Sequence, residues 1–146
     1  MATIFVETRI DAPVEVCFDL ARSVELHLES ARTTGERAVA GTRQGLLGAG
    51  DWVTWEARHL GRWRRLTVRV TAFDRPHAFR DEQVNGPFVR FRHDHLFEPE
   101  AGGTLMRDVL DFASRFGLLD RLVLAPYLRR FLVRRNEAIR RAARGR

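Results

Sequence analysis

The clearest periodicity in the chain is an alternation of apolar and polar residues from residue 52 onward. In residues 63–73 every second side chain from Leu66 to Ala72 is apolar, and arginine and threonine occupy the positions between. A period of two is typical of a strand with one buried and one solvated face. Short turns such as Asn85-Gly86-Pro87 separate successive runs, which predicts hairpins and an antiparallel sheet. The expected strands are 3–9, 52–59, 63–73, 78–84, 88–97 and 104–112.

Helical spacing occurs in three places around these strands. An apolar stripe from Val14 to Ala21 predicts one short helix, and Ser23 can cap a second. Pro126 suits the first turn of a long terminal helix, because proline deeper in a helix would break a backbone hydrogen bond. One stripe of that helix holds Leu128, Phe131, Leu132, Arg135 and Ile139. The order of elements predicts a single α+β domain over residues 1–146.

The charge of the chain is concentrated at its C-terminal end. All 25 basic residues are arginine, and the formal net charge is +6. Residues 118–146 hold nine arginines and two acidic residues, whereas the first 117 residues hold sixteen arginines and seventeen acidic residues. Arginine stays charged at any ordinary pH, so a modest local surplus produces the high isoelectric point. We therefore do not expect nucleic acid to be the partner of the whole domain.

Several classes of protein are excluded by simple features. Cys17 is the only cysteine, so neither an internal disulfide nor a cysteine-based zinc site can form. The N-terminal residues lack the basic and apolar regions of a signal peptide. No apolar run approaches the roughly 18 residues of a membrane span. We expect a cytoplasmic protein.

A band of polar side chains shares the inward face of the predicted sheet. The apolar neighbours Phe91 and Phe97 place His93 and His95 on the buried side of one strand. By the same alternation, the inward polar residues are His59, Asp81, Gln83, His93, His95 and Asp108. Burying an unpartnered polar group costs a few kcal/mol, so these groups must satisfy one another, hold water or bind a ligand.

Three interpretations of this polar band follow from the residue types. The residues can form a self-satisfied ladder between strands, or some of them can orient a polar group of a ligand in an apolar pocket. A third interpretation is zinc, held by His93 and His95 together with His59 or Asp108. A histidine pair two residues apart is weak support for a metal, so we expect no metal and no cofactor.

Several sequence strings resemble the START-like (SRPBCC) superfamily, which has the helix-grip fold. In particular they resemble small single-domain bacterial proteins described as polyketide cyclase/dehydrase-like or ligand-binding. The strings include Ile10-Asp-Ala-Pro13, Gly45-Leu-Leu-Gly-Ala-Gly-Asp51, Val53-Thr-Trp-Glu-Ala57, Phe91-Arg-His-Asp-His95, Gly103-Thr-Leu-Met106 and Arg135-Asn136. The resemblance implies a curved antiparallel sheet of about seven strands, two short helices, and a long C-terminal helix over an internal cavity.

The function that this resemblance implies is binding of a small hydrophobic or amphipathic molecule, such as a lipid, a polyketide or an aromatic compound. The ligand would lie between the sheet and the C-terminal helix. Inward-facing positions of the predicted elements nominate the ligand-binding residues. They are Trp55, His59, Val68, Phe91, His93, His95, Asp108, Leu128 and Leu132.

Two alternative functions remain open. The cavity could belong to a cyclase or dehydratase in which His93 or His95 acts as general base and Asp108 orients it. The chain could instead be a partner-binding module that acts through its basic C-terminal helix, with the cavity collapsed. The absence of a recognisable nucleophile favours non-catalytic binding. The sequence leaves a homodimer open.

Overall fold

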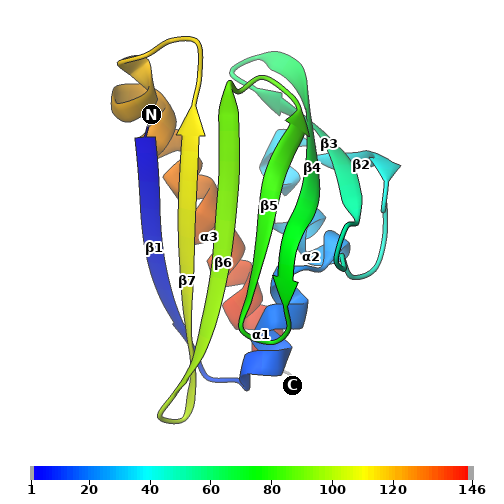
Figure 1. Ribbon diagram of the computed structural model, residues 1–146, viewed down its shortest axis with the longest axis vertical. Helices are drawn as coiled ribbons and strands as arrows, with labels where there is room; N and C mark the ends of the chain where they lie inside the picture. Colours follow the sequence, from blue (N-terminus) through cyan, green and yellow to red (C-terminus); the bar gives the residue numbers. More distant parts are fainter. Residues whose placement is uncertain (1, 145–146) are drawn as a thin grey trace.

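Seven antiparallel strands form one curved sheet in the computed structural model, which describes residues 2–144 (Figure 1). The strands are β1 (Ala2–Ile10), β2 (Arg37–Gly41), β3 (Trp52–His59), β4 (Arg62–Asp74), β5 (Ala78–Asn85), β6 (Arg90–Glu100) and β7 (Gly103–Ala113). Their spatial order is β1-β7-β6-β5-β4-β3-β2. The curved sheet of about seven strands that the family resemblance implied is confirmed.

The first and the last strand of the chain, β1 and β7, are neighbours in the sheet. These strands pair along nine residues, from Ala2 opposite Phe112 to Ile10 opposite Thr104. Every second residue of β1 is buried, as expected for a strand with one face against the core. Because β1 pairs with it, β7 is an interior strand with β1 on one side and β6 on the other.

All the helices lie on one face of the sheet, behind it in Figure 1. They are α1 (Val14–Ala21), α2 (Val24–Ser30), a 3-10 turn (Arg32–Thr34), a π-helical turn η2 (Asp120–Leu124) and α3 (Ala125–Ala143). The Ser23 hydroxyl accepts a hydrogen bond from the Leu26 amide at 3.2 Å, which confirms the predicted cap. Pro126 lies in the first turn of α3, as predicted.

Strand β2 has no counterpart among the strands that the alternation predicted. It has five residues at the edge of the sheet, and its pairing with β3 shifts register between Ala38 and Ala40. None of its residues is fully buried. Without one buried face, the strand produces no period-two pattern, so only its pairing with β3 reveals it.

The core lies between the helices and the concave face of the sheet. Phe18 of α1 is fully buried, and its ring contacts those of Phe73, Phe79 and Phe97 at centroid distances of 5.2–5.4 Å. A smaller apolar cluster joins β1 and β7 to Leu132 of α3. None of the helices in residues 2–144 is both long and apolar enough to cross a bilayer.

Candidate ligand-binding cavity

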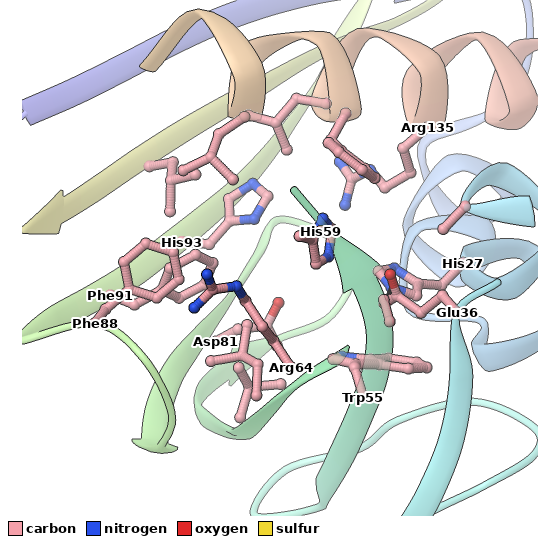
Figure 2. Close-up of a pocket in the computed structure, with 18 of the residues that line it drawn as sticks. His27, Glu36, Trp55, His59, Arg64, Asp81, Phe88, Phe91, His93 and Arg135 are labelled. Carbon is pink, nitrogen blue, oxygen red and sulfur yellow. Dashed lines mark hydrogen bonds and ion pairs between the residues drawn. The ribbon is translucent and has the colours of Figure 1, made fainter. Parts of the chain in front are cut away.

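A cavity of about 290 Å³ lies between the sheet and α3 (Figure 2). Its volume is close to the lower end of the range for small-molecule pockets, roughly 300–1,000 Å³. Eight of the nine residues proposed from sequence line it: Trp55, His59, Val68, Phe91, His93, His95, Leu128 and Leu132. The ninth, Asp108, lies behind the wall and is fully buried.

Asp108 is the centre of a buried hydrogen-bond network. Its Oδ1 accepts from Arg135 Nη2 at 2.6 Å and from His93 Nε2 at 2.8 Å, and its Oδ2 accepts from Asn136 Nδ2 at 2.9 Å. Burial alone would raise the pKa of Asp108, but the Arg135 charge and the His93 hydrogen bond outweigh it and hold that pKa below its ordinary value. Asp108 therefore stays ionised and fixes His93 in the cavity wall.

His95 is held from both sides. Arg135 Nη1 donates to its Nδ1 at 3.2 Å, so Nε2 carries the proton and donates to Asp81 Oδ2 at 2.8 Å. Burial and the neighbouring His93 lower the pKa of His95 to about 4. The ring is neutral at pH 7, and neither nitrogen is free to act on a ligand. It also stacks on Phe79 with centroids 4.0 Å apart.

Asp81 keeps hydrogen-bonding capacity that the protein does not use. Burial would raise its pKa, but the hydrogen bond from His95 and nearby positive charge lower it below the ordinary value, so the side chain is a carboxylate. Its Oδ1 has no hydrogen-bond partner within residues 2–144. A carboxylate can accept several hydrogen bonds, and Asp81 lines the cavity. Because Oδ1 is itself buried, a donor on a bound molecule would reach it only after the Asp81 side chain turns toward the cavity.

Two further polar pairs lie at the other side of the cavity. His59 Nδ1 and the Tyr127 hydroxyl share a hydrogen bond of 2.7 Å, and burial lowers the pKa of His59. His27 Nε2 lies 2.5 Å from Glu36 Oε1, and its ring stacks on Trp55 at 4.0 Å. Figure 2 shows His27, Glu36 and Trp55 together on this side, away from His93 and Asp81.

The sequence identified part of this site and missed part of it. Arg135 was expected on the inward stripe of the terminal helix but was not assigned to the site, although an arginine among inward leucines requires a buried acidic partner. Tyr127, His27, Glu36 and Arg64 also line the cavity and were not assigned to the site from the sequence. The signal was present for two of them, because His27 shares the stripe of the second short helix and Arg64 is in phase with the inward set of its strand. Gln83, by contrast, bonds to the backbone of Phe88 and does not line the cavity.

One group of side chains has the spacing of metal ligands. Single donor atoms of Asp81, His93 and His95 all lie within 4.8 Å of one another. This set differs from the combinations with His59 or Asp108 that the sequence suggested. The Arg135 guanidinium lies 3.2 Å from His95 Nδ1, and its positive charge opposes a cation at that place. We therefore assign no metal to this group.

The sheet, the long helix and the cavity between them define a START-like protein of the helix-grip fold. The chain belongs to the family described as "Polyketide cyclase / dehydrase and lipid transport", whose model matches residues 1–144. The resemblance seen in the sequence is confirmed. A search of curated proteins found no match.

Solved structures of the same fold come from distant relatives. The protein TTHA0849 from Thermus thermophilus is 23% identical, with 97% of this chain and 99% of that chain covered and a TM-score of 0.76. Ara h 8.0201 is 15% identical, with 99% of both chains covered and a TM-score of 0.74. Ginseng major latex-like protein 151 from Panax ginseng is 15% identical, with 97% of both chains covered and a TM-score of 0.72. At these identities the likeness establishes the fold alone.

Proposed function

We propose that the protein binds a small amphipathic molecule in the cavity, with an apolar body and at least one hydroxyl group. The observation that carries this proposal is the pairing of a mostly apolar wall with one carboxylate, Asp81, that lacks a partner for Oδ1 among the described residues. Aromatic side chains such as Trp55, Phe88 and Phe91 offer flat surfaces to an aromatic or polyketide-like ring. The cavity volume of about 290 Å³ favours a compact aromatic or polyketide-like ligand over a long lipid.

The partner-binding alternative required a collapsed cavity, and the cavity is open. The basic helix also uses several of its arginines within the fold. Arg135 is buried on Asp108, Arg134 bonds to Thr33, and Arg140 bonds to the Arg9 carbonyl. Arg146, which contributes to the predicted charge surplus, lies outside the described residues.

Filling the cavity from α3 is expected to weaken ligand binding strongly. Leu128→Trp adds bulk to a side chain that lines the cavity, whereas Val133→Trp adds the same kind of bulk to an exposed position of the same helix. Calorimetric titration with 2-naphthol should give at least about tenfold weaker binding for Leu128→Trp, because the lost space cannot be recovered in a packed wall. Val133→Trp should bind like the parent protein. Equal weakening by both variants would contradict a ligand in this cavity.

Asp81 is expected to discriminate between a hydroxyl and an ether. 2-Naphthol can donate a hydrogen bond to the carboxylate, while 2-methoxynaphthalene cannot. The parent protein should prefer naphthol by roughly ten- to a hundredfold, about the worth of one hydrogen bond to a charged group. In Asp81→Asn the amide replaces an acceptor oxygen by a donor, so the preference should disappear. A preference that survives this change would place the hydroxyl elsewhere. Native mass spectrometry of freshly purified protein would then identify any co-purified molecule.

One observation favours a catalytic role as the second candidate. His93 donates from Nε2 to the ionised Asp108, and its ring also lines the cavity. A histidine oriented by a buried carboxylate is a suitable general base for a cyclase or dehydratase. His93→Gln should then retain 2-naphthol binding but lose turnover of a poly-β-ketone substrate. Turnover that survives His93→Gln would exclude His93 as the base, and a parent protein without turnover would leave only the binding function.

A further inference from the structure

Many large apolar side chains are exposed at one end of the sheet, where strands β3, β5 and β7 finish. Strands β3, β5 and β7 run in the same direction, so the three stretches at their ends lie together, at the top of Figure 1. We call residues 59–64, 84–90 and 114–124 the mouth edge. Among the described residues, nine of the fourteen exposed large apolar side chains lie here. They are Leu60, Trp63, Val84, Val89, Phe116, Leu118, Leu119, Leu122 and Val123.

The most exposed of these side chains are held in place by a buried anchor. Leu118 is 81% exposed, Leu122 is 73% exposed, and the intervening Asp120 is only 1% exposed. The Asp120 carboxylate accepts hydrogen bonds from both the amide and the hydroxyl of Ser114. This anchor fixes the turn so that the leucines project outward. A fixed apolar patch of this kind marks an interaction surface.

The exposed charges of the mouth edge are all positive. Its five arginines are Arg62, Arg64, Arg90, Arg115 and Arg121, and its single acidic residue, Asp120, is buried. The ion pairs found among the described residues use other arginines, such as Arg37, Arg65 and Arg92. The surface therefore combines apolar side chains at loop tips with cationic side chains that lack acidic partners within residues 2–144.

We propose that the mouth edge docks onto the surface of an anionic lipid bilayer. Apolar tips can enter the boundary between headgroups and acyl chains, and the surrounding arginines can bind the anionic headgroups. Trp63 suits the same boundary, where tryptophan is enriched. A second copy of the chain fits this surface less well, because a symmetric contact would bring the two sets of five arginines together.

Docking at this edge would place the mouth of the cavity against the lipid. All three stretches contribute residues to the cavity lining, including Leu60, Phe88 and Phe116. A molecule with an apolar body could then move between bilayer and cavity without crossing water. The docking itself does not depend on which molecule the cavity holds.

Vesicle sedimentation tests this proposal. The protein should bind vesicles that mix phosphatidylcholine with phosphatidylglycerol, and it should bind phosphatidylcholine alone at least about tenfold more weakly. Binding to the mixed vesicles should fall as salt rises from about 0.1 M to about 0.5 M, because salt screens exposed charges. Equal binding to both vesicle types, or none to either, would overturn the proposal.

Matched variants separate the apolar and the charged contributions. Leu118→Ser with Leu122→Ser should weaken binding at least about tenfold, since two exposed leucines no longer enter the lipid. Leu46→Ser, which changes an exposed leucine in the loop before β3 at the other end of that strand, should leave binding unchanged. Arg115→Gln with Arg121→Gln should also weaken binding about tenfold, whereas Arg43→Gln should not.

A spectroscopic measurement keeps the test independent of variant stability. The emission of Trp63, which is 57% exposed, should shift to shorter wavelength when mixed vesicles are added, and Trp63→Phe should remove the shift. A shift that persists in Trp63→Phe would contradict docking at this edge. The mouth-edge variants should bind 2-naphthol normally without vesicles, so a failure of docking is distinguishable from a failure of cavity binding.

Discussion

Replacing Asp108 by asparagine is expected to lower the free energy of unfolding by about 3–5 kcal/mol, the usual cost of breaking one side of a buried ion pair. Asp108 is fully buried and Arg135 is 7% exposed, so the guanidinium cannot reach solvent when its partner loses its charge. The amide introduced at this position would also present a hydrogen to one of the donors that now bond to Asp108. Urea denaturation followed by circular dichroism measures the change.

Two comparisons isolate the buried charge as the cause. Glu100→Gln breaks a surface pair with Arg9, whose side chains are 36% and 77% exposed, and should cost less than about 1 kcal/mol. Combining Asp108→Asn with Arg135→Met removes both charges and should recover part of the lost stability. A cost for Asp108→Asn no larger than that of Glu100→Gln would show that the pair does not stabilise the fold.

The protein is expected to lose stability as the pH falls from about 6.5 to about 4, mainly because of His95. The folded-state pKa of His95 is lowered to about 4 from an ordinary value of 6.5, so the unfolded chain binds a proton in this interval and the folded chain does not. The free energy of unfolding therefore rises with pH, and the contribution of His95 is complete above about pH 6.5. The loss reaches about 3 kcal/mol at the low end. Denaturation midpoints across this pH range measure it.

A histidine variant distinguishes this cause from general acid sensitivity. His95→Gln should flatten most of the slope, whatever its effect on stability at pH 7, because the titrating group is gone. A smaller slope should remain, since burial also lowers the pKa of His59. A slope that is identical in His95→Gln and the parent protein would contradict the linkage.

These two predictions address the same structural feature, a charged cluster that holds the wall of an apolar cavity. Arg135 bonds to Asp108 on β7 and to His95 on β6, and Asn136 joins Asp108 to Thr8 on β1. The cluster thus connects α3 to three strands. Because its bonds are internally satisfied, it orients His93 and Asp81 without competing with a ligand for their free positions.

Much of the fold could be predicted from local pattern. The alternation in β4 and β6 set which side chains point inward, and for that reason the predicted lining residues Val68 and Phe91 do line the cavity. The period of two fixes the register of these strands, since a slip of one residue would turn the apolar side chains toward solvent. Strand β2 escaped prediction because it has no buried face.

The sequence by itself determined the class of fold, the inward faces of the strands and the presence of buried polar groups among apolar ones. Only the tertiary structure decided which of those groups line the cavity. Asp108 and Arg135 are 27 residues apart, and His95 and Asp81 are 14 apart, so no local pattern records their contacts. Two inward carboxylates that look alike in sequence differ for this reason. Asp108 meets Arg135, His93 and Asn136, whereas Asp81 bonds to His95 and its Oδ1 has no partner within residues 2–144.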